Sequence, residues 1–362
     1  MKKISIVDSS LGPGGAEKLI VEMAPIMRDK GYDVEVLILT SYGDVFSEQL
    51  LKNDIRVKFF RNKASYWSIK YVFDLYKSLK NSDAVYTHVI QSRFFTAIAC
   101  LFLSKKIRLI TTEHNTHNRR RDIKLFRYID SLIYSKYDKV ISITDQVEHN
   151  LLNHLKSKKK DKYIVIPNGV DLDKFNNSSV CDRSDFGFSS DDFIILMIGR
   201  FAPAKDQRTL ISSLKFLPND FKLLLVGNGE SLNEHKQFVK ENELVDRVKF
   251  IEFHSDIPEI IKMCDLGVLS SFWEGMPISA LEKMASGIPF LGSDVPGIND
   301  LLSIENKEML FQQGNISELA EKIIKIKENE DYRIDNINRG LNISNKYSLH
   351  NMVDQYLQCI EK

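Results

Sequence analysis

The chain has 362 residues, of which 43% are hydrophobic, and its formal net charge is +1. A chain of this length and composition can bury two hydrophobic cores, so two domains are expected. Its longest apolar run, at residues 97–103, is far too short to cross a bilayer, and its four scattered cysteines form no C-x-x-C pair. These features exclude a transmembrane helix and a zinc-binding cysteine cluster, and they favour a reduced, cytoplasmic protein.

Short apolar runs alternate with helical patterns along the chain, beginning with a first strand at residues 4–7 that we do not interpret as a signal peptide. Further strands are predicted at 34–39, 84–86, 109–111, 140–143, 164–166, 194–198, 222–226, 248–251, 266–269 and 289–292. Helices are predicted between most of them, including 16–29, 68–79, 145–155 and 210–214. This alternation predicts an α/β fold with doubly wound parallel sheets, which bind ligands at the carboxyl ends of their strands. Residues 171–185, rich in Asn, Ser and Asp, are predicted to link the two domains.

Basic residues are concentrated in the first half of the chain. Residues 1–175 carry 30 Lys and Arg against 20 Asp and Glu, whereas the remainder carries 20 against 29. Dense clusters occur at 119–121, followed by Lys124 and Arg127, and at 156–162. Because no nucleic-acid motif accompanies them, the predicted partner is an anionic membrane surface and not a nucleic acid. The alternative is that these residues form ordinary solvated surfaces.

The segment 67–79 adds a second possible membrane element. Its aromatic and aliphatic residues lie near helical spacing, with lysines at positions 70, 77 and 80 among them. A helix of this kind suits the membrane interface, with aromatic rings at headgroup depth and lysines on the lipid phosphates. The alternative is that the helix packs in the core of the first domain.

The most informative stretch of the sequence surrounds Glu274 and Glu282, which stand eight residues apart around a Gly-x-Pro turn. Pro277 suits the first position of a helix, and Gly287 with Pro289 suits its end. A helix N-terminus between two carboxylates is a natural seat for phosphate, because its amide groups and its dipole attract anions. A sugar nucleotide fits this layout, since hydroxyl groups lie at both ends of its diphosphate. The alternative is an ordinary capped helix with solvated glutamates.

This stretch resembles the E-x7-E motif of the family 4 retaining glycosyltransferases, which have the GT-B fold. Three further segments resemble motifs of that family in the same order: Gly-Pro-Gly-Gly-Ala-Glu at 12–17, Pro-Asn-Gly-Val-Asp at 167–171 and Gly-Arg-Phe-Ala-Pro-Ala-Lys at 199–205. The resemblance implies two Rossmann-like domains that face each other across a cleft. Residues 1–172 plus 348–362 would form an N-terminal acceptor-binding domain, and 173–347 a C-terminal donor-binding domain.

The resemblance also implies a donor site. Arg200 and Lys205 would bind the donor diphosphate and stabilise it as it leaves, because a departing diphosphate needs fixed positive charge. Glu282 would accept hydrogen bonds from the ribose, and Glu274 would contact a hydroxyl group of the donor sugar as a catalytic residue. The remaining donor-site residues would be Gly199, Asn228, Gly229, Gly275, Met276 and Pro277. Uridine is the favoured base, with guanosine as the alternative.

The glycine loop near the N-terminus predicts one wall of the acceptor site. Gly14 and Gly15 allow a ligand to approach the backbone closely at a helix N-terminus. A dinucleotide oxidoreductase is disfavoured, because Thr40 and Ser41 follow the second strand where an acidic residue would be needed. No D-x-D pair stands at the end of a predicted strand, so neither a catalytic metal nor another cofactor is expected.

Two histidines follow later strands of the first half, at positions that catalytic-face histidines occupy in related enzymes. His88 follows one strand and is the predicted catalytic residue of this half, whereas Glu113 and His114 follow the next strand as acceptor-binding residues. Arg119 and His117 stand just beyond and are further acceptor candidates. Either histidine of the strand ends could instead be structural.

The predicted activity is that of a retaining hexosyltransferase (EC 2.4) in surface polysaccharide synthesis, for lipopolysaccharide or capsule. A hexose or N-acetylhexosamine would move from a nucleotide diphosphate sugar, with UDP favoured, to a lipid-linked or glycan acceptor. By resemblance, the acceptor hydroxyl attacks beside the departing phosphate without a metal ion. We expect the protein in the cytoplasm, peripheral on the inner face of the cytoplasmic membrane. The alternatives are a GT-B sugar-nucleotide epimerase and a non-catalytic peripheral membrane scaffold.

Overall fold

The computed structural model describes residues 1–362 except 63–66, 115–118, 158–159, 253, 255 and 362. The chain divides into two compact units, of which the first comprises Met1–Gly169 with Leu349–Lys362 and the second Val170–Ser348. The boundaries expected at residues 172 and 348 lie within a few residues of these. Each unit is built on one parallel sheet with helices on both faces, so the predicted doubly wound α/β architecture is confirmed.

The first unit contains a seven-stranded sheet in the order β3-β2-β1-β4-β5-β6-β7, in which all neighbouring strands are parallel. The central strands are almost entirely buried, as expected for a parallel sheet covered on both faces. The strand order reverses at β1, and at such a point ligands bind beside the carboxyl ends of the strands. The strands are β1 (Lys3–Asp8), β2 (Asp33–Thr40), β3 (Arg56–Arg61), β4 (Ala84–Thr87), β5 (Arg108–Glu113), β6 (Lys139–Ser142) and β7 (Tyr163–Val165).

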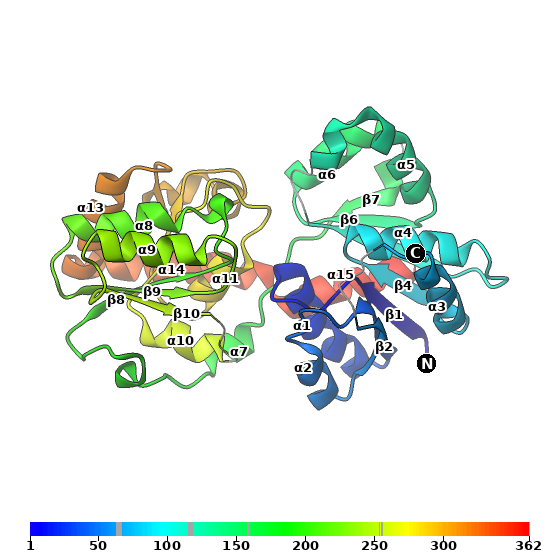
Figure 1. Ribbon diagram of the computed structural model, residues 1–362, viewed down its shortest axis with the longest axis horizontal. Coiled ribbons are helices and arrows are strands. Elements are labelled where there is room, and N and C mark those ends of the chain that lie inside the picture. The colour runs from blue at the N-terminus through cyan, green and yellow to red at the C-terminus, as the bar shows by residue number, and fades with distance from the viewer. Residues whose placement is uncertain (63–66, 115–118, 158–159, 253, 255, 362) are drawn as a thin grey trace. The chain divides into compact units, whose positions relative to one another are not determined.

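Helices cover both faces of this sheet (Figure 1). They are α1 (Gly15–Asp29), α2 (Ser47–Lys52), α3 (Lys70–Leu79), α4 (Ile90–Cys100), α5 (Lys124–Ser135), α6 (Asp145–Leu155) and α15 (Leu349–Glu361). On one face, α1 and α15 close a core in which the Tyr356 hydroxyl lies 3.1 Å from Thr112 Oγ1. On the other face, α3, α4 and α6 contribute buried residues to a second core. The last helix of the chain therefore completes the first unit.

The second unit contains a six-stranded parallel sheet in the order β10-β9-β8-β11-β12-β13. Its strands are β8 (Phe193–Ile198), β9 (Phe221–Val226), β10 (Val248–Ile251), β11 (Leu266–Leu269), β12 (Phe290–Ser293) and β13 (Leu310–Phe311). Its helices are α7 (Leu172–Asn176), α8 (Gln207–Ser213), α9 (Leu232–Glu241), α10 (Ile257–Met263), α11 (Ile278–Ala285), α12 (Ile298–Leu302), α13 (Ile316–Glu328) and α14 (Glu330–Ser344). The strand order reverses at β8, so the loops after β8 and β11 lie side by side at the ligand-binding edge.

Three expectations from the sequence need correction. Strands β3 and β13 were not predicted, because β3 is a half-exposed edge strand with charged residues and β13 has only two residues. The predicted linker at 171–185 is partly folded into α7, whose first turn Asp171 caps by accepting from the Lys174 amide at 3.0 Å. Phe175 of this helix is buried, so the segment packs on the second unit and is not a free connection.

The helical segment at 67–79 packs in the core of the first unit, as the alternative interpretation held. Tyr71, Leu75 and Leu79 of α3 are fully buried, and the Trp67 ring contacts the rings of Phe94 and Phe95. These residues of α3 therefore pack against protein, whereas Trp67, Ile69 and Phe73 of the same segment are 55%, 65% and 63% exposed. Among the described residues, no helix is long and apolar enough to cross a bilayer.

Candidate active site

The loops after β8 and β11 bring together two of the predicted donor-site residues. Lys205 Nζ donates to Glu274 Oε1 at 2.6 Å and to Oε2 at 2.8 Å, and the Ser271 hydroxyl donates to Glu274 Oε1 at 2.6 Å. The side chain of Lys205 is 24% exposed and that of Glu274 10% exposed. The sequence assigned both residues to the donor, and the structure places them in one partly buried ion pair.

Arg200 lies in the same loop as Lys205 but is held more loosely. Its guanidinium pairs with Glu230, with Nη2 2.9 Å from the carboxylate oxygen Oε2, and the Arg200 side chain is 69% exposed. The Arg200 carbonyl accepts from Gln207 Nε2 at 3.0 Å, which fixes the backbone of the loop. An exposed ion pair exchanges readily for another anion, so this guanidinium can turn to a phosphate while its backbone stays in place.

The loop after β9 packs against the Arg200 loop through two glycines. A Cβ atom on Gly227 would lie 2.1 Å from the Gly199 carbonyl oxygen, and one on Gly229 would lie 2.3 Å from that of Phe201. The Phe201 amide donates to the Asn228 carbonyl at 3.0 Å. No side chain larger than hydrogen fits at either glycine, so Asn228 and Gly229 lie against the predicted phosphate loop.

Gly297, which sequence reasoning did not single out, closes the other side of the Glu274 loop. A Cβ atom on Gly297 would lie 2.4 Å from the Glu274 carbonyl oxygen, and its φ of +84° also favours glycine. The Glu274 amide donates to the Pro296 carbonyl at 3.2 Å. The Pro-Gly dipeptide at 296–297 is a turn signal that could have drawn attention to this contact.

Helix α11 carries the second glutamate of the motif. Pro277 is the residue that caps this helix and lies one position before its first residue, and Gly287, at φ +75°, follows its end. Gly275 and Met276 connect Glu274 to the helix as expected. The Ala280 and Leu281 amides donate to the Pro277 carbonyl at 3.0 and 3.4 Å, so the two amides before them, at the start of α11, are the ones suited to a phosphate. Glu282 is buried on α11, at 3% exposure.

Lys283 on α11 is a buried amine that sequence reasoning missed. Burial lowers its pKa to about 7, and Glu282 only partly offsets this effect. Its Nζ donates to the Ser279 carbonyl at 3.0 Å, and a Cβ atom on Gly267 of β11 would lie 2.3 Å from the Lys283 Cδ. The lysine chain therefore fills the space that a glycine leaves in the neighbouring strand.

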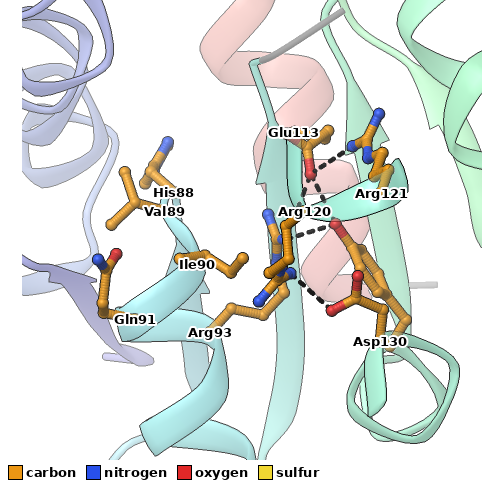
Figure 2. Close-up of a pocket in the computed structure, with 10 residues that line it drawn as sticks. His88, Val89, Ile90, Gln91, Arg93, Glu113, Arg120, Arg121 and Asp130 are labelled. Carbon is orange, nitrogen blue, oxygen red and sulfur yellow. Dashed lines mark hydrogen bonds and ion pairs between the residues drawn. The ribbon is translucent and has the colours of Figure 1, made fainter. Parts of the chain in front are cut away.

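The first unit holds a separate cavity of about 170 Å³ (Figure 2). It lies beyond the carboxyl ends of β4 and β5, under α5 and the short 3₁₀ helix Arg119–Asp122. The residues that line it are His88, Val89, Ile90, Gln91, Arg93, Glu113, Arg120, Arg121, Asp130 and Tyr134. Predicted residues His88 and Glu113 are among them, whereas Arg93, Asp130 and Tyr134 were not predicted.

Glu113 is the centre of a buried polar network in this cavity. Its Oε2 accepts from the Tyr134 hydroxyl at 2.6 Å and lies 3.1 Å from Arg121 Nη2 and 3.3 Å from Arg93 Nη1. Arg93 also donates to Thr111 Oγ1 at 2.7 Å. Burial raises the pKa of the Tyr134 hydroxyl well above its usual range, so it remains a donor to the carboxylate.

A second carboxylate, Asp130, lines the same cavity. Arg120 Nη2 lies 2.6 Å from Asp130 Oδ1, and His154 Nε2 lies 2.9 Å from Asp130 Oδ2. Three guanidinium groups and two carboxylates thus line this cavity. The surplus of one positive charge gives the site a preference for an anion.

The two histidines of the strand ends contact each other. His88 Nδ1 lies 3.2 Å from His114 Nε2, and the rings are stacked with centroids 5.4 Å apart. Burial lowers the pKa of His88 well below its usual range and that of His114 to about 4, so both rings are neutral at pH 7. Among the described residues, His88 Nε2 has no hydrogen-bond partner although it is buried. A polar atom of this kind beside a cavity is suited to a ligand.

The structure describes the remaining acceptor candidates only in part. Gly14 is the residue before α1 and Gly15 is its first residue, and a Cβ atom on Gly14 would lie 2.1 Å from Glu17 Oε2. Arg119 begins the 3₁₀ helix, but its side chain and the whole of His117 lie outside the described residues. No group of three His, Cys, Asp or Glu side chains is placed to hold a metal ion in the part of the chain that the structure describes.

Comparisons with known proteins agree with this two-unit arrangement. Residues 13–174 match the family model of Glycosyltransferase Family 4, and residues 181–342 match that of Glycosyl transferases group 1. The chain is 25% identical to an Escherichia coli UDP-Gal:alpha-D-GlcNAc-diphosphoundecaprenol alpha-1,3-galactosyltransferase, covering 98% of this chain and 95% of the relative. It is 23% identical to a Campylobacter jejuni diphospho-undecaprenol 4-alpha-N-acetylgalactosaminyltransferase, covering 86% and 89% of the two chains.

Solved structures give the same fold over the whole length. The Anabaena protein HepE, solved in complex with UDP and glucose, superimposes with a TM-score of 0.86 at 21% identity, covering 100% of both chains. The protein TarM superimposes with a TM-score of 0.77 at 15% identity, covering 100% of this chain and 99% of TarM. At these identities the similarity establishes the fold of the two units.

Proposed function

Because this chain belongs to the glycosyltransferases, with a Family 4 match in its first unit and a group 1 match in its second, we propose that it is a retaining, metal-independent hexosyltransferase. It transfers a hexose or N-acetylhexosamine from a UDP-sugar to a lipid-linked acceptor in surface polysaccharide synthesis. The observation that carries the proposal is the Lys205–Glu274 ion pair at the ligand-binding edge of the second sheet. Such a pair holds a cation and a hydroxyl-binding carboxylate ready for a diphosphate sugar.

When the donor binds, its diphosphate replaces the carboxylate partner of each cation. A phosphate oxygen takes the place of the Glu274 carboxylate at Lys205 Nζ, and Arg200 leaves its exposed partner Glu230 for the same diphosphate. Glu274 then accepts a hydrogen bond from a hydroxyl group of the donor sugar. The charge of the ligand replaces the charge of the carboxylate, so no cation is left unpaired.

The remaining donor contacts follow from the positions of Glu282 and the glycine loops. Glu282, which is buried on α11, accepts hydrogen bonds from the ribose hydroxyls, because hydrogen bonds to a carboxylate are stronger than those to a neutral acceptor. Asn228 and Gly229 lie beside the phosphate loop and contact the nucleotide. UDP is the proposed nucleotide, since the Escherichia coli relative is named for UDP-Gal.

Transfer takes place at the anomeric carbon with retention of configuration. The bond from that carbon to the diphosphate oxygen breaks, and the acceptor oxygen forms a bond to the same carbon on the same face. The acceptor proton passes to the leaving phosphate oxygen. Arg200 and Lys205 stabilise the charge that develops on the diphosphate, which is the contribution expected of preorganised cations.

The cavity of the first unit binds the acceptor. The two relatives are named for substrates with a diphosphate linked to undecaprenol, and a diphosphate suits a cavity with three arginines and two carboxylates. Arg120 and Arg121 supply the charge, and neutral His88 offers its Nε2 to an acceptor hydroxyl. Basic residues of the first half, including Lys156 and Lys162, attract the protein to an anionic membrane on its cytoplasmic face.

The test is to incubate the protein with a panel of UDP- and GDP-sugars, with and without a short-chain polyprenyl diphosphate-linked sugar. The expected result is a disaccharide product formed only with acceptor, whose new linkage has the anomeric configuration of the donor by NMR. A product of inverted configuration would overturn the retaining mechanism. Nucleotide release with no acceptor-dependent product favours an epimerase, and absence of nucleotide binding by calorimetry favours a scaffold.

The metal-free mechanism has its own test in the same assay. Chelator should leave the transfer rate unaltered, because Arg200 and Lys205 supply the positive charge that a divalent ion would otherwise bring to the diphosphate. Loss of activity with chelator and its rescue by magnesium would show that a metal ion is needed. Treatment of a heat-inactivated sample provides the background rate.

A further inference from the structure

Helix α5 of the first unit is amphipathic in the reverse of the usual sense. Its buried positions are Asp130 and Tyr134, both polar. Leu125, Tyr128 and Leu132, in contrast, are 65%, 67% and 62% exposed. An ordinary surface helix buries its apolar stripe and exposes its polar one, so this helix requires a reason for its orientation.

The inward orientation of Asp130 and Tyr134 follows from the cavity that they line. Asp130 pairs with Arg120 at 2.6 Å (Figure 2), and the Tyr134 hydroxyl donates to Glu113 at 2.6 Å. These contacts fix one face of α5 against the polar network. The opposite face, which carries the exposed apolar residues, is therefore presented outward by the same contacts.

The exposed residues form one continuous stripe. Positions 125, 128 and 132 are separated by three and four residues, which places them on one side of a helix, and exposed Ile123 precedes them. Together these four residues make a continuous apolar surface, and exposure of such a surface to water is unfavourable. This stripe is called the α5 face below, and it consists of Ile123, Leu125, Tyr128 and Leu132.

Between positions 123 and 136, the exposed charges beside the α5 face are all positive. Lys124 and Lys136 are exposed, and Arg127 lies with its guanidinium 5.2 Å from the centre of the Tyr128 ring. The only acidic residue between positions 123 and 136 is Asp130, which is buried. An apolar stripe that has exposed cations on its own helix, and no exposed carboxylate between positions 123 and 136, complements a surface that is apolar inside and anionic outside.

We propose that the α5 face docks on an anionic lipid bilayer, with its apolar side chains at the boundary of headgroups and acyl chains and Lys124 and Arg127 on lipid phosphates. Twelve helical residues span only about 18 Å, so α5 lies in the interface and does not cross it. This inference rests on the membrane association in the proposed function and names the surface responsible. It names a surface other than the segment 67–79, in which Tyr71, Leu75 and Leu79 are buried in the core.

Docking through this face has a consequence for the acceptor. The inner side of α5 lines the arginine cavity, and a helix is about 10 Å across. The cavity therefore comes to lie within about 10 Å of the lipid surface, close to the level of the lipid phosphate groups. A diphosphate on a membrane-embedded lipid can reach the cavity without leaving the bilayer.

The principal experiment measures binding of the full chain to sedimented vesicles of neutral phosphatidylcholine, with and without anionic phosphatidylglycerol. Wild type should bind the anionic vesicles in a salt-sensitive way, and the double variant L125S/L132S should bind them at least tenfold more weakly. The control is F216S/V245S, which removes two similarly exposed apolar residues from the second unit. Both variants should keep wild-type activity on a soluble acceptor analogue, because neither pair lines the cavity or the donor loops.

A second measurement reports insertion directly. The variant Y128W should show a blue-shifted tryptophan emission with anionic vesicles, relative to the change in the wild-type protein. Equal vesicle binding by L125S/L132S and wild type, or an unshifted Y128W spectrum, would overturn the proposal. So would a wild-type dimer in sedimentation velocity that L125S/L132S converts to monomer, since a second copy would then occupy the face. If wild type itself binds no vesicles, the membrane association in the proposed function fails with it, whereas hexosyl transfer is judged separately by the soluble assay.

Discussion

The two candidate sites hold their cations differently. In the first unit, Arg93 and Glu113 are almost fully buried, and each has several partners within the protein. In the second unit, Lys205 and Arg200 form ion pairs that are partly or largely exposed. A buried network costs much to disturb, whereas an exposed pair exchanges partners easily. The first arrangement suits a cavity that must keep its shape, and the second suits cations that must change partners during a reaction.

The largest expected effect is on stability and comes from the first unit. Arg93→Leu leaves the Glu113 carboxylate without one of its buried cations and should lower the free energy of unfolding by about 3–5 kcal/mol. The matched control is Arg56→Leu, which removes the cation of an ion pair on the surface of the same sheet and should cost less than about 1 kcal/mol. Urea unfolding measures both. Equal losses for the two variants would remove the distinction between a fixed and an exposed pair.

The next effect is on catalysis and comes from the second unit. Lys205→Ala or Arg200→Ala should lower kcat by about 100-fold, the scale for losing a preorganised charge at the leaving group. Arg200→Ala, which breaks a largely exposed ion pair, should cost less than about 1 kcal/mol in stability. Lys215→Ala, which removes an exposed lysine bonded to Asn242, is the control and should change neither quantity. Activity within a few-fold of wild type for both variants would refute the assignment of these cations to the diphosphate.

The buried lysine of the second unit gives a pH dependence. The pKa of Lys283 is about 7 in the folded protein and 10.5 for an ordinary lysine, so the unfolded state binds more protons between these pH values. Stability should therefore rise with pH in this window, by up to about 1.4 kcal/mol per pH unit relative to Lys283→Met. Below pH 7 the difference becomes constant. Urea unfolding of both proteins at several pH values from about 7.5 to 9.5 tests this, and parallel profiles would contradict it.

The smallest of these effects concerns two buried glutamates. Glu282→Gln should weaken UDP binding about tenfold, because a neutral amide is a poorer acceptor for ribose hydroxyls, and calorimetry measures this directly. Glu113→Gln in the first unit should leave UDP affinity unchanged and reduce stability instead. Unchanged nucleotide affinity in Glu282→Gln would mean that this carboxylate does not bind the ribose. A similar loss in both variants would point to a general structural effect.

The donor site could be predicted from sequence largely because its residues stand in short, contiguous loops. Arg200 and Lys205 belong to one segment, and Glu274 and Glu282 to another, so local spacing carries the pattern. The pairing of Lys205 with Glu274 could not be predicted, because these residues are 69 positions apart and meet only when β8 and β11 are neighbours. The contact of Gly297 with the Glu274 loop depends on the same sheet order.

The first unit shows what helical periodicity in a sequence cannot predict. The segments 68–79 and 124–135 both have helical apolar spacing, yet Tyr71 of the first is buried and Tyr128 of the second is exposed. A period of 3.6 residues indicates that a helix has an apolar side but not what that side faces. Here the polar partners of Asp130 and Tyr134, which come from other elements, decide the orientation of α5.

The sequence by itself determined the alternation of strands and helices, the two-domain organisation and the loop residues of the donor motif, because these depend on local pattern and on turn-forming residues. Tertiary structure decided which charges meet. The cavity of the first unit collects Arg93, Glu113 and Tyr134 from three elements, and only the order of the parallel strands and the packing of α4 and α5 bring them within hydrogen-bond distance. Interactions between residues far apart in the chain form only when the fold brings those residues together, so local sequence spacing cannot predict them.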